Sequence, residues 1–248
     1  MNIAKTASHI KAIFFDIGGK GGAWQRFERG ELELYPFYAL FGEELSDTKL
    51  GNQYYRVPAL PDSLKVDGRE LFGRMMRSPE FDPYILSAIH KLRETKRFRI
   101  VALTNNYSAQ YERIRDTPPS QQGEHKFSPE AELEFLGWGE STGGPAGVGI
   151  RALFDDFVDS SVVGSRKPEP AIYQYACKAN GVSPEEVVFL DDLGLNLKTA
   201  QKLGMRTIHV PIGGSREAVQ QLQQLLGIQL LDSEIRSPNL RSEGRSKL

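Results

Sequence analysis

One segment, VVFLDDLGLNLKTAQKLGMRTIHV from Val187 to Val210, constrains the fold more than any other part of the chain. An apolar run ends at two adjacent carboxylates, Asp191 and Asp192, and apolar residues at helical spacing then lead into a second apolar run. This order predicts strand, helix and strand, the repeating unit of an α/β fold with a parallel sheet. Ligands of such sheets bind outside the carboxyl ends of the strands, so the two acids could hold a hard cation. Alternatively, Asp192 only caps the following helix.

Three further segments place polar residues at the end of a predicted strand or the start of a predicted helix. IKAIFFD ends in Asp16, with Gly18 two residues later, and FRIVALT ends in Thr104 and continues into Asn105. SRKPEP places Lys167 before a proline that opens the helix AIYQYACKAN. Taken singly, the asparagine fits an ordinary turn and the lysine a solvated surface position.

In chain order these are an Asp, a Thr-Asn pair, a Lys and an Asp pair, and here the sequence resembles the haloacid dehalogenase superfamily. The resemblance runs from Ile10 to about Asp232. LTNN, RKPEPAIY, VVFLDDLGLNLKTAQKLGM and LLGIQLLD look especially like the N-terminal phosphatase domain of soluble epoxide hydrolases and the related domain of an acyl-CoA dehydrogenase family. It implies a Rossmann-like α/β core with a parallel sheet and a small inserted helical cap.

The resemblance implies a Mg²⁺-dependent hydrolase that cleaves a small phosphate monoester through an aspartyl-phosphate intermediate. Asp16 would be the nucleophile, because a carboxylate can attack phosphorus and split one hard hydrolysis into two steps. Mg²⁺ would neutralise and orient the phosphate. The implied residues are Asp16, Thr104 and Lys167 for catalysis, Thr104, Asn105 and Lys167 for substrate binding, and Asp16, the Gly18 carbonyl, Asp191 and Asp192 for the metal.

Gly18 departs from the family pattern, since phosphatases of the superfamily usually have a second Asp there as general acid and base. Loss of a proton-transfer group typically costs about a hundred- to ten-thousandfold in rate. Two alternatives therefore stay open: a metal-independent haloacid dehalogenase, whose halide leaving group needs no proton, and a weakly active or inactive module that binds phosphate ligands or partners. The acidic pair at Asp191 speaks against the dehalogenase, which needs no metal.

The stretch from Gly19 to Gly22 is a second departure. The family has a helical turn, a hairpin flap and the first cap helix after the nucleophile strand, whereas this chain continues directly into AWQRFERGELELYPFYALFGEELS, which resembles a later part of the cap. Our hypothesis is a deletion, a skipped exon or a faulty gene model at about residues 19–22, which sequencing the transcript would decide. If the junction is real, we expect a site less well closed against water.

The rest of the chain divides by composition. Residues 8–19 and 96–232 are expected to form the core, and residues 20–95 a reduced helical cap and a return helix. Residues 107–150 are rich in Gly, Pro, Ser and Gln and predict a mobile insertion, in which His125 and Trp138 could contact substrate, although a solvated loop histidine is the simpler interpretation. Residues 233–248 predict a flexible tail.

Several titratable residues favour structural interpretations. Asp155 and Asp156 precede a strand predicted at residues 157–161, so they should lie away from the carboxyl ends. His209 falls inside a strand pattern and is expected to be structural. Cys177 lies in a helical pattern and is expected to be a small buried thiol.

Composition and the last residues bear on partners and location. The 248 residues are 40% hydrophobic with a net charge of −1, which suits one core domain with a small cap and gives no basic excess to attract nucleic acid or an anionic membrane. There is no apolar window long enough to cross a bilayer, and the single cysteine fits a reducing compartment. The chain ends in SKL, Ser246 to Leu248, which predicts binding to a peroxisomal import receptor and a peroxisomal, otherwise cytoplasmic, location.

Overall fold

The computed structural model describes residues 12–15 as backbone, and residues 23–47, 64–77, 81–118, 127–139, 142 and 144–232. Its strands are β1 (Ala12–Phe15), β2 (Arg99–Thr104), β3 (Asp156–Asp159), β4 (Val187–Asp191) and β5 (Arg206–His209). Its helices are α2 (Ala23–Glu28), α3 (Leu34–Ser46), α5 (Gly68–Met76), α6 (Pro83–Thr95), α7 (Ser108–Arg115), α8 (Pro129–Leu136), α9 (Val148–Arg151), α10 (Ser160–Val163), α11 (Pro170–Asn180), the 3-10 helix η1 (Pro184–Glu186), α12 (Gly194–Lys202) and α13 (Ser215–Leu226).

The described strands form one parallel sheet in the order β3-β2-β1-β4-β5. The chain builds outward from β1 through β2 to β3 and then crosses to β4 on the other side of β1. The strand order therefore reverses between β1 and β4, which is where open α/β sheets bind ligands. This topology confirms the predicted Rossmann-like core with its parallel sheet.

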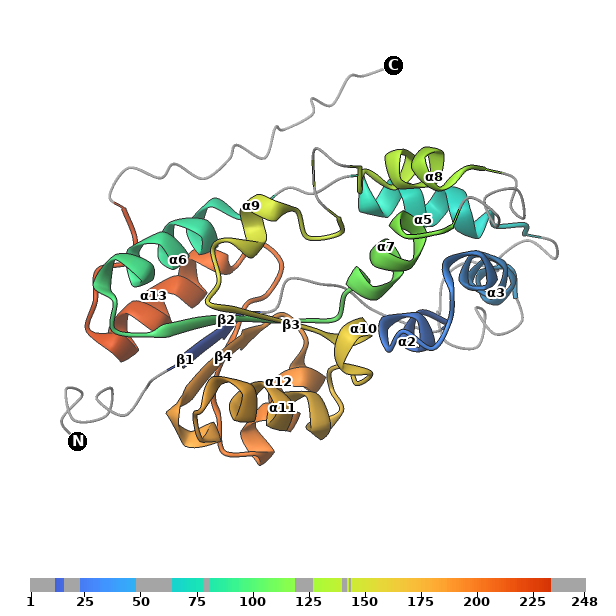
Figure 1. The fold of residues 1–248 in the computed structure, drawn as a ribbon. Coiled ribbons are helices and arrows are strands. Elements are labelled where there is room, and N and C mark those ends of the chain that lie inside the picture. The colour runs from blue at the N-terminus through green and yellow to red at the C-terminus, as the bar shows by residue number, and fades with distance from the viewer. Residues whose placement is uncertain are drawn as a thin grey trace, which may run out of the picture.

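Helices cover both faces of the sheet (Figure 1). On one face α6 and α13 pack on the sheet through an apolar cluster that includes Leu92, Val188 and Leu222. On the other face α11 and α12 pack through a second cluster that includes Tyr173, Phe189 and Ala200. Because β4 is buried on both faces, it reads in the sequence as an unbroken apolar run.

A third group of helices, α2, α3, α5, α7 and α8, lies beyond one end of the sheet (Figure 1). Its apolar cluster is largely aromatic, and the ring of Phe37 contacts those of Trp24, Phe27 and Phe72. We call this group the cap. Residues 23–46 and 68–76 of this group fall in the range 20–95 expected for the cap, whereas α7 and α8 come from outside it, and α6 packs on the core.

The segment 107–150, for which the sequence predicts mobility, differs from expectation in its described part. Helices α7 and α8 form there, and Ile114, Leu136 and Trp138 are buried in the aromatic cluster of the cap. Trp138 is only 2% exposed and stacks near Tyr107, so the described structure gives it a packing role in place of the predicted substrate contact. The sequence does not predict these contacts, because the apolar residues involved are far apart and Gly- and Pro-rich stretches lie between them.

The third strand is also shorter than expected, because it ends at Asp159 and the residues after it form α10. Asp155 and Asp156 lie at its amino end as predicted, where Asp155 accepts a hydrogen bond from the Ile100 amide at 2.7 Å. Cys177 is buried, and burial raises the pKa of its thiol to about 11.

Several predictions lie outside the described residues. They concern Asp16, Gly18, the junction at residues 19–22, His125 and the tail 233–248 with its SKL end. Within the described chain, no helix combines the length and the apolar character that a membrane span requires.

Candidate active site

The carboxyl ends of β2, β3 and β4 bring polar side chains to one edge of the sheet. In the parallel register Thr104 lies opposite Asp159, and Asp191 follows Leu190, which is paired with Phe15 at the end of β1. Thr104, Asp159 and Asp191 are each at most 3% exposed. The sheet therefore delivers buried polar groups to the edge where the strand order reverses.

Lys167 and Asp191 form a fully buried ion pair at this edge. The Lys167 Nζ atom lies 3.2 Å from Asp191 Oδ2, and both side chains have no exposed surface. The ammonium also lies 5.6 Å from the centre of the Phe189 ring. A charge taken out of water is costly unless it is paired, so the pair must be held by its surroundings. The alternative of a solvated surface lysine is excluded.

Asp191 is held by a set of donors besides the lysine. The Asn196 side-chain amide donates to its two oxygens at 3.1 and 3.0 Å, and the Leu193 backbone amide donates to Oδ1 at 2.7 Å. Leu193 precedes α12 and Asn196 lies in its first turn. Because the donors come from both the loop and the helix, the carboxylate is fixed in one orientation.

The loop that carries Lys167, residues 165–169 and called the lysine loop below, is joined to the end of β2 by Asn105. The backbone N–H of Lys167 donates to Asn105 Oδ1 at 2.8 Å, and Asn105 Nδ2 donates to the Lys167 carbonyl at 3.1 Å. The peptide bond between Lys167 and Pro168 is cis. Asn105 thus positions the lysine loop, and its predicted contact with substrate stays a prediction.

Thr104 presents an unsatisfied polar atom. Its side chain is 1% exposed, and its hydroxyl has no hydrogen-bond partner among the described residues. A buried hydroxyl without a partner costs about 1–3 kcal/mol, so such groups call for a ligand or water. Thr104 is thus placed to donate to an anion at the sheet edge.

Asp192 differs from its neighbour in sequence because it is exposed. The residue at the amino end of α12 is Leu193, and no side chain caps the helix there, so the alternative of Asp192 as a simple helix cap is not borne out. His209 from β5 lies with its Nε2 atom 3.0 Å from the Asp192 carbonyl oxygen. His209 therefore supports the backbone of the acidic pair, in keeping with the structural role expected for it.

A buried carboxylate from the cap approaches the lysine loop. Glu28, in α2, accepts a hydrogen bond from Trp24 Nε1 at 2.8 Å and pairs with Arg166 Nε at 2.6 Å. Glu28 has no exposed surface. Burial raises the pKa of its carboxyl to about 7, although the charge of Arg166 acts in the opposite direction.

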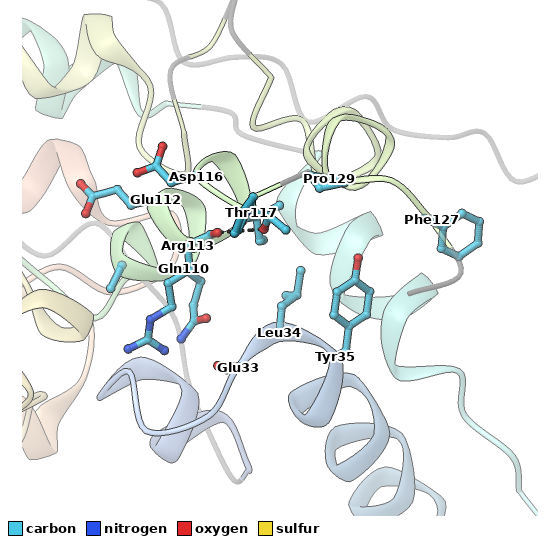
Figure 2. A pocket seen from close by; sticks show the side chains of 13 residues that line it. Glu33, Leu34, Tyr35, Gln110, Glu112, Arg113, Asp116, Thr117, Phe127 and Pro129 are labelled. Carbon is cyan, nitrogen blue, oxygen red and sulfur yellow. Dashed lines mark hydrogen bonds between the residues drawn. The ribbon is translucent and has the colours of Figure 1, made fainter. Parts of the chain in front are cut away.

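A pocket of about 570 Å³ lies away from these residues, between α7 and the start of α3 (Figure 2). Leu34 and Tyr35 line it on the α3 side, and Gln110 and Arg113 on the α7 side. None of the site residues that the sequence predicts lines this pocket, so the pocket is separate from the candidate active site.

Sequence reasoning missed four residues that shape the site. Arg166 adjoins Lys167, and Asn196 follows Asp191 by five positions at the start of a predicted helix, so both had a local signal. Asp159 and Glu28 had none that we can name, because only the folded chain brings them to the sheet edge and the lysine loop. The residues that the structure brings together as expected are Thr104, Asn105, Lys167 and Asp191, with Asp192 beside them.

Comparison with known sequences identifies relatives that match most of this chain or a part of it. The sequence model of the haloacid dehalogenase-like hydrolases matches residues 39–204. Acyl-CoA dehydrogenase family member 10 of Mus musculus is 30% identical over 232 residues, which cover 92% of this chain and 17% of that protein. Bifunctional epoxide hydrolase 2 of Rattus norvegicus is 42% identical over 94 residues, covering 37% of this chain and 17% of the relative. The chain thus spans 17% of the length of each of these two relatives.

A smaller relative and a solved structure add to these matches. Glyceraldehyde 3-phosphate phosphatase of Methanocaldococcus jannaschii is 30% identical over 91 residues, which cover 33% of this chain and 40% of that protein. A HAD-like family hydrolase from Porphyromonas gingivalis superimposes with a TM-score of 0.55 at 19% identity, covering 89% of this chain and all of the other. At this identity the structural match shows the fold alone, and it agrees with the predicted architecture.

Proposed function

Because the chain belongs to the haloacid dehalogenase-like hydrolases, we propose that it is a Mg²⁺-dependent phosphatase that hydrolyses a small phosphate monoester through Asp16. The presence of a curated phosphatase among its relatives supports the choice of reaction. The proposal depends on the chemistry that this chain retains at the sheet edge.

One observation carries the proposal: a buried ammonium and a buried unsatisfied hydroxyl lie at the same sheet edge. Lys167 supplies the positive charge and Thr104 the hydroxyl donor. Preorganised donors and charges in a site without water stabilise the charge that develops on a transferring phosphoryl group. A phosphate held between these groups and β1 would face the residue that follows Phe15, which is Asp16 in the sequence.

The donor chemistry at the acidic pair fits Mg²⁺, which prefers carboxylate and carbonyl oxygens. Among the described residues no three His, Cys, Asp or Glu side chains gather closely enough to bind a metal ion. A Mg²⁺ site would therefore need Asp16 and the Gly18 carbonyl together with Asp192 and Asp191. Of the pair, Asp192 is exposed, whereas Asp191 already accepts from protein donors. Bound Mg²⁺ would neutralise phosphate charge.

The proposed reaction has two displacements at phosphorus. A carboxylate oxygen of Asp16 forms a bond to phosphorus while the bond from phosphorus to the leaving oxygen breaks. Water then attacks the phosphorus of the acyl phosphate, which releases inorganic phosphate and restores Asp16. Because Gly18 carries no acid, the leaving oxygen must take its proton from water. Substrates whose leaving group needs no protonation should therefore react fastest.

The first experiment measures release of inorganic phosphate from an aryl phosphate, with and without Mg²⁺, for the wild type and for Asp16→Asn. We expect turnover that requires Mg²⁺ and is abolished by the substitution, because the amide cannot act as the nucleophile. A folded wild type without turnover would contradict the proposal. Metal-independent release of halide from a haloacid would instead favour the dehalogenase, and binding of phosphate without turnover the binding module.

A second experiment uses Gly18→Asp to restore the proton-transfer group. We expect the variant to raise kcat for an alkyl phosphate by about a hundredfold or more, because its alkoxide leaving group needs a proton. An aryl phosphate with a weakly basic leaving group is the matched control and should gain much less. Equal gains on both substrates would show that proton donation does not limit the wild type.

A further inference from the structure

Glu28 is buried at the contact between the cap and the core, and each of its carboxylate oxygens has a separate donor. Oε1 accepts from Trp24 Nε1 at 2.8 Å, and Oε2 pairs with Arg166 Nε at 2.6 Å. The Arg166 side chain is only 9% exposed and that of Glu28 has no exposed surface. A fully enclosed carboxyl with both oxygens engaged cannot reach a substrate, so it does not replace the acid missing at residue 18.

The partner of Glu28 belongs to the loop that carries Lys167. The cap holds this loop at a second point, where Arg29 Nη1 lies 2.9 Å from Glu169 Oε1. Glu169 Oε2 in turn accepts from Ser165 Oγ at 3.0 Å and from the Arg166 amide at 3.2 Å. On the core side, Asn105 holds the loop through the backbone of Lys167. The lysine loop is thus held between the end of β2 and the end of α2.

We propose that Glu28 is a positioning residue of this site. From the cap it pairs with Arg166 and thereby fixes the lysine loop, which places Lys167 beside Asp191. This inference rests on the proposed function, in which Lys167 contacts the phosphate. It assigns to the cap a direct part in ordering the catalytic edge, in addition to covering it.

The charged groups around Glu28 bear on the pH at which it pairs with Arg166 as a carboxylate. Arg166 and Lys167 face it from the lysine loop, and the Tyr107 hydroxyl from the start of α7. Glu44 of α3 accepts a hydrogen bond from the Ala23 amide, at the opposite end of α2 from Glu28. Helix α10 has the sequence SSVV and therefore brings no charged side chain to Glu28. Because burial raises the pKa of the Glu28 carboxyl to about 7, its charge, and with it the hold on Arg166, should change near neutral pH.

The first test reads the carboxyl directly, without enzyme activity. The chain has two tryptophans, and the indole of Trp24 donates to Glu28, so the indole signals in a proton–nitrogen spectrum provide a probe and a control. We expect the Trp24 signal to titrate with a midpoint near pH 7 in the wild type and to stay flat in Glu28→Gln. The Trp138 signal, assigned through Trp138→Phe, should not follow this transition. A wild-type Trp24 signal that is flat between pH 5.5 and 8.5, roughly 1.5 units either side of the expected midpoint, would overturn the protonation step.

The second test measures kcat/KM for Mg²⁺-dependent hydrolysis of an aryl phosphate across the same pH range. We expect the wild-type value to rise through pH 7 as Glu28 ionises, and the Glu28→Gln value to be lower by about ten- to a hundredfold without that rise. Glu70→Gln is the matched control, because Glu70 is a cap carboxylate paired with Arg74 at a partly exposed position. It should keep the wild-type profile. Unchanged kcat/KM in Glu28→Gln would overturn the inference.

Binding of inorganic phosphate in the presence of Mg²⁺, measured by calorimetry, separates failure of this inference from failure of the proposed function. Wild type that binds phosphate but does not turn over would contradict the phosphatase proposal, and weaker phosphate binding by Glu28→Gln than by Glu70→Gln would still support the positioning role. If Glu28→Gln and wild type bind phosphate equally, the positioning role is wrong. A wild type that neither binds nor hydrolyses would remove both proposals, because there would be no site to position.

Discussion

Asp191 and Asp192 are adjacent in the sequence, yet they differ in burial and in the residues that contact them. Asp191 is buried, forms an ion pair with Lys167 and accepts a hydrogen bond from Asn196, whereas Asp192 is exposed. The sequence predicts the pair as one acidic site, because an apolar strand followed by two carboxylates does not reveal which of them turns inward. The distinction comes from the lysine loop and α12, which are separate elements.

The pair offers a direct comparison of two substitutions. Asp191→Asn should lower the free energy of unfolding by about 3 kcal/mol, because it removes the carboxylate that opposes the buried ammonium of Lys167. Asp192→Asn should change it by less than about 0.5 kcal/mol, as is usual for an exposed position. Urea unfolding of both variants checks the difference. Similar losses in the two would show that Asp191 and Lys167 do not depend on each other.

The Glu28 carboxyl also makes stability depend on pH. Its pKa is about 7 in the folded chain and 4.5 as the reference value, so the folded state binds more protons than the unfolded state between these values. The free energy of unfolding should therefore fall as pH rises from 4.5 to 7, by about 3 kcal/mol from this group, and then level off. Urea unfolding at a series of pH values should show this slope in the wild type and not in Glu28→Gln. Parallel curves for the two proteins would contradict the assignment.

At the scale of elements, two glycines let α3 and the start of α5 approach closely. A Cβ atom at Gly68 would lie 2.2 Å from the Tyr38 carbonyl oxygen, and one at Gly42 would lie 2.8 Å from the Val66 carbonyl oxygen. These atoms belong to the backbone and cannot swing aside as a flexible side chain can. The contact between the two helices therefore depends on the absence of side chains at both positions.

We expect Gly68→Ala to destabilise the cap by about 2 kcal/mol, because the added methyl group forces the two helices apart. Gly149→Ala in α9 is the matched control, since a Cβ atom there would have nothing within 4 Å. It should leave stability unchanged or raise it by up to about 1 kcal/mol through the better helix propensity of alanine. Tryptophan fluorescence during urea unfolding reports the cap. Equal effects of the two substitutions would show that the close approach carries no energy.

The elements also differ in how well the sequence predicts them. β4 and α12 follow from an unbroken apolar run and a helical repeat, which are local patterns. The cap helices α7 and α8 are not predicted, because stretches rich in Gly, Pro, Ser and Gln lie beside them, although α8 has its own signals in a Ser cap, a first-turn Pro and a Gly at its end. Their buried side chains reach a cluster built mostly from α2, α3 and α5. Glu28 illustrates the same limit at the site, since its partner Arg166 lies 138 positions away. Contacts between distant elements are what composition and spacing fail to predict.

At the scale of the molecule, the cap and the core have separate apolar clusters but are joined by the chain itself, by hydrogen bonds such as that from the Ser108 amide to Asp159, and by charged side-chain pairs. The chain passes from β2 at Thr104 to α7 with only three residues between them, so a core strand runs almost directly into a cap helix. The buried pair of Glu28 with Arg166 and the more exposed pair of Arg29 with Glu169 link α2 to the lysine loop. Of the two pairs, the exposed one should contribute less than about 1 kcal/mol, whereas loss of Arg166 from the buried pair would leave the Glu28 charge without a partner.

These links predict that cap and core unfold together. Both tryptophans, Trp24 and Trp138, lie in the cap cluster, so their fluorescence follows the cap, whereas far-ultraviolet circular dichroism follows helices of both parts. In wild type the two signals should give coincident urea transitions, which is the mark of a cooperative unit. In Arg166→Ala the fluorescence transition should move to lower urea than the circular dichroism transition, because the Glu28 carboxylate is left buried without its partner. Arg29→Ala, which removes only the more exposed tie, should leave the transitions coincident. Separate transitions already in the wild type would show that the cap orders independently, and then Glu28 could not transmit its protonation to the position of Lys167.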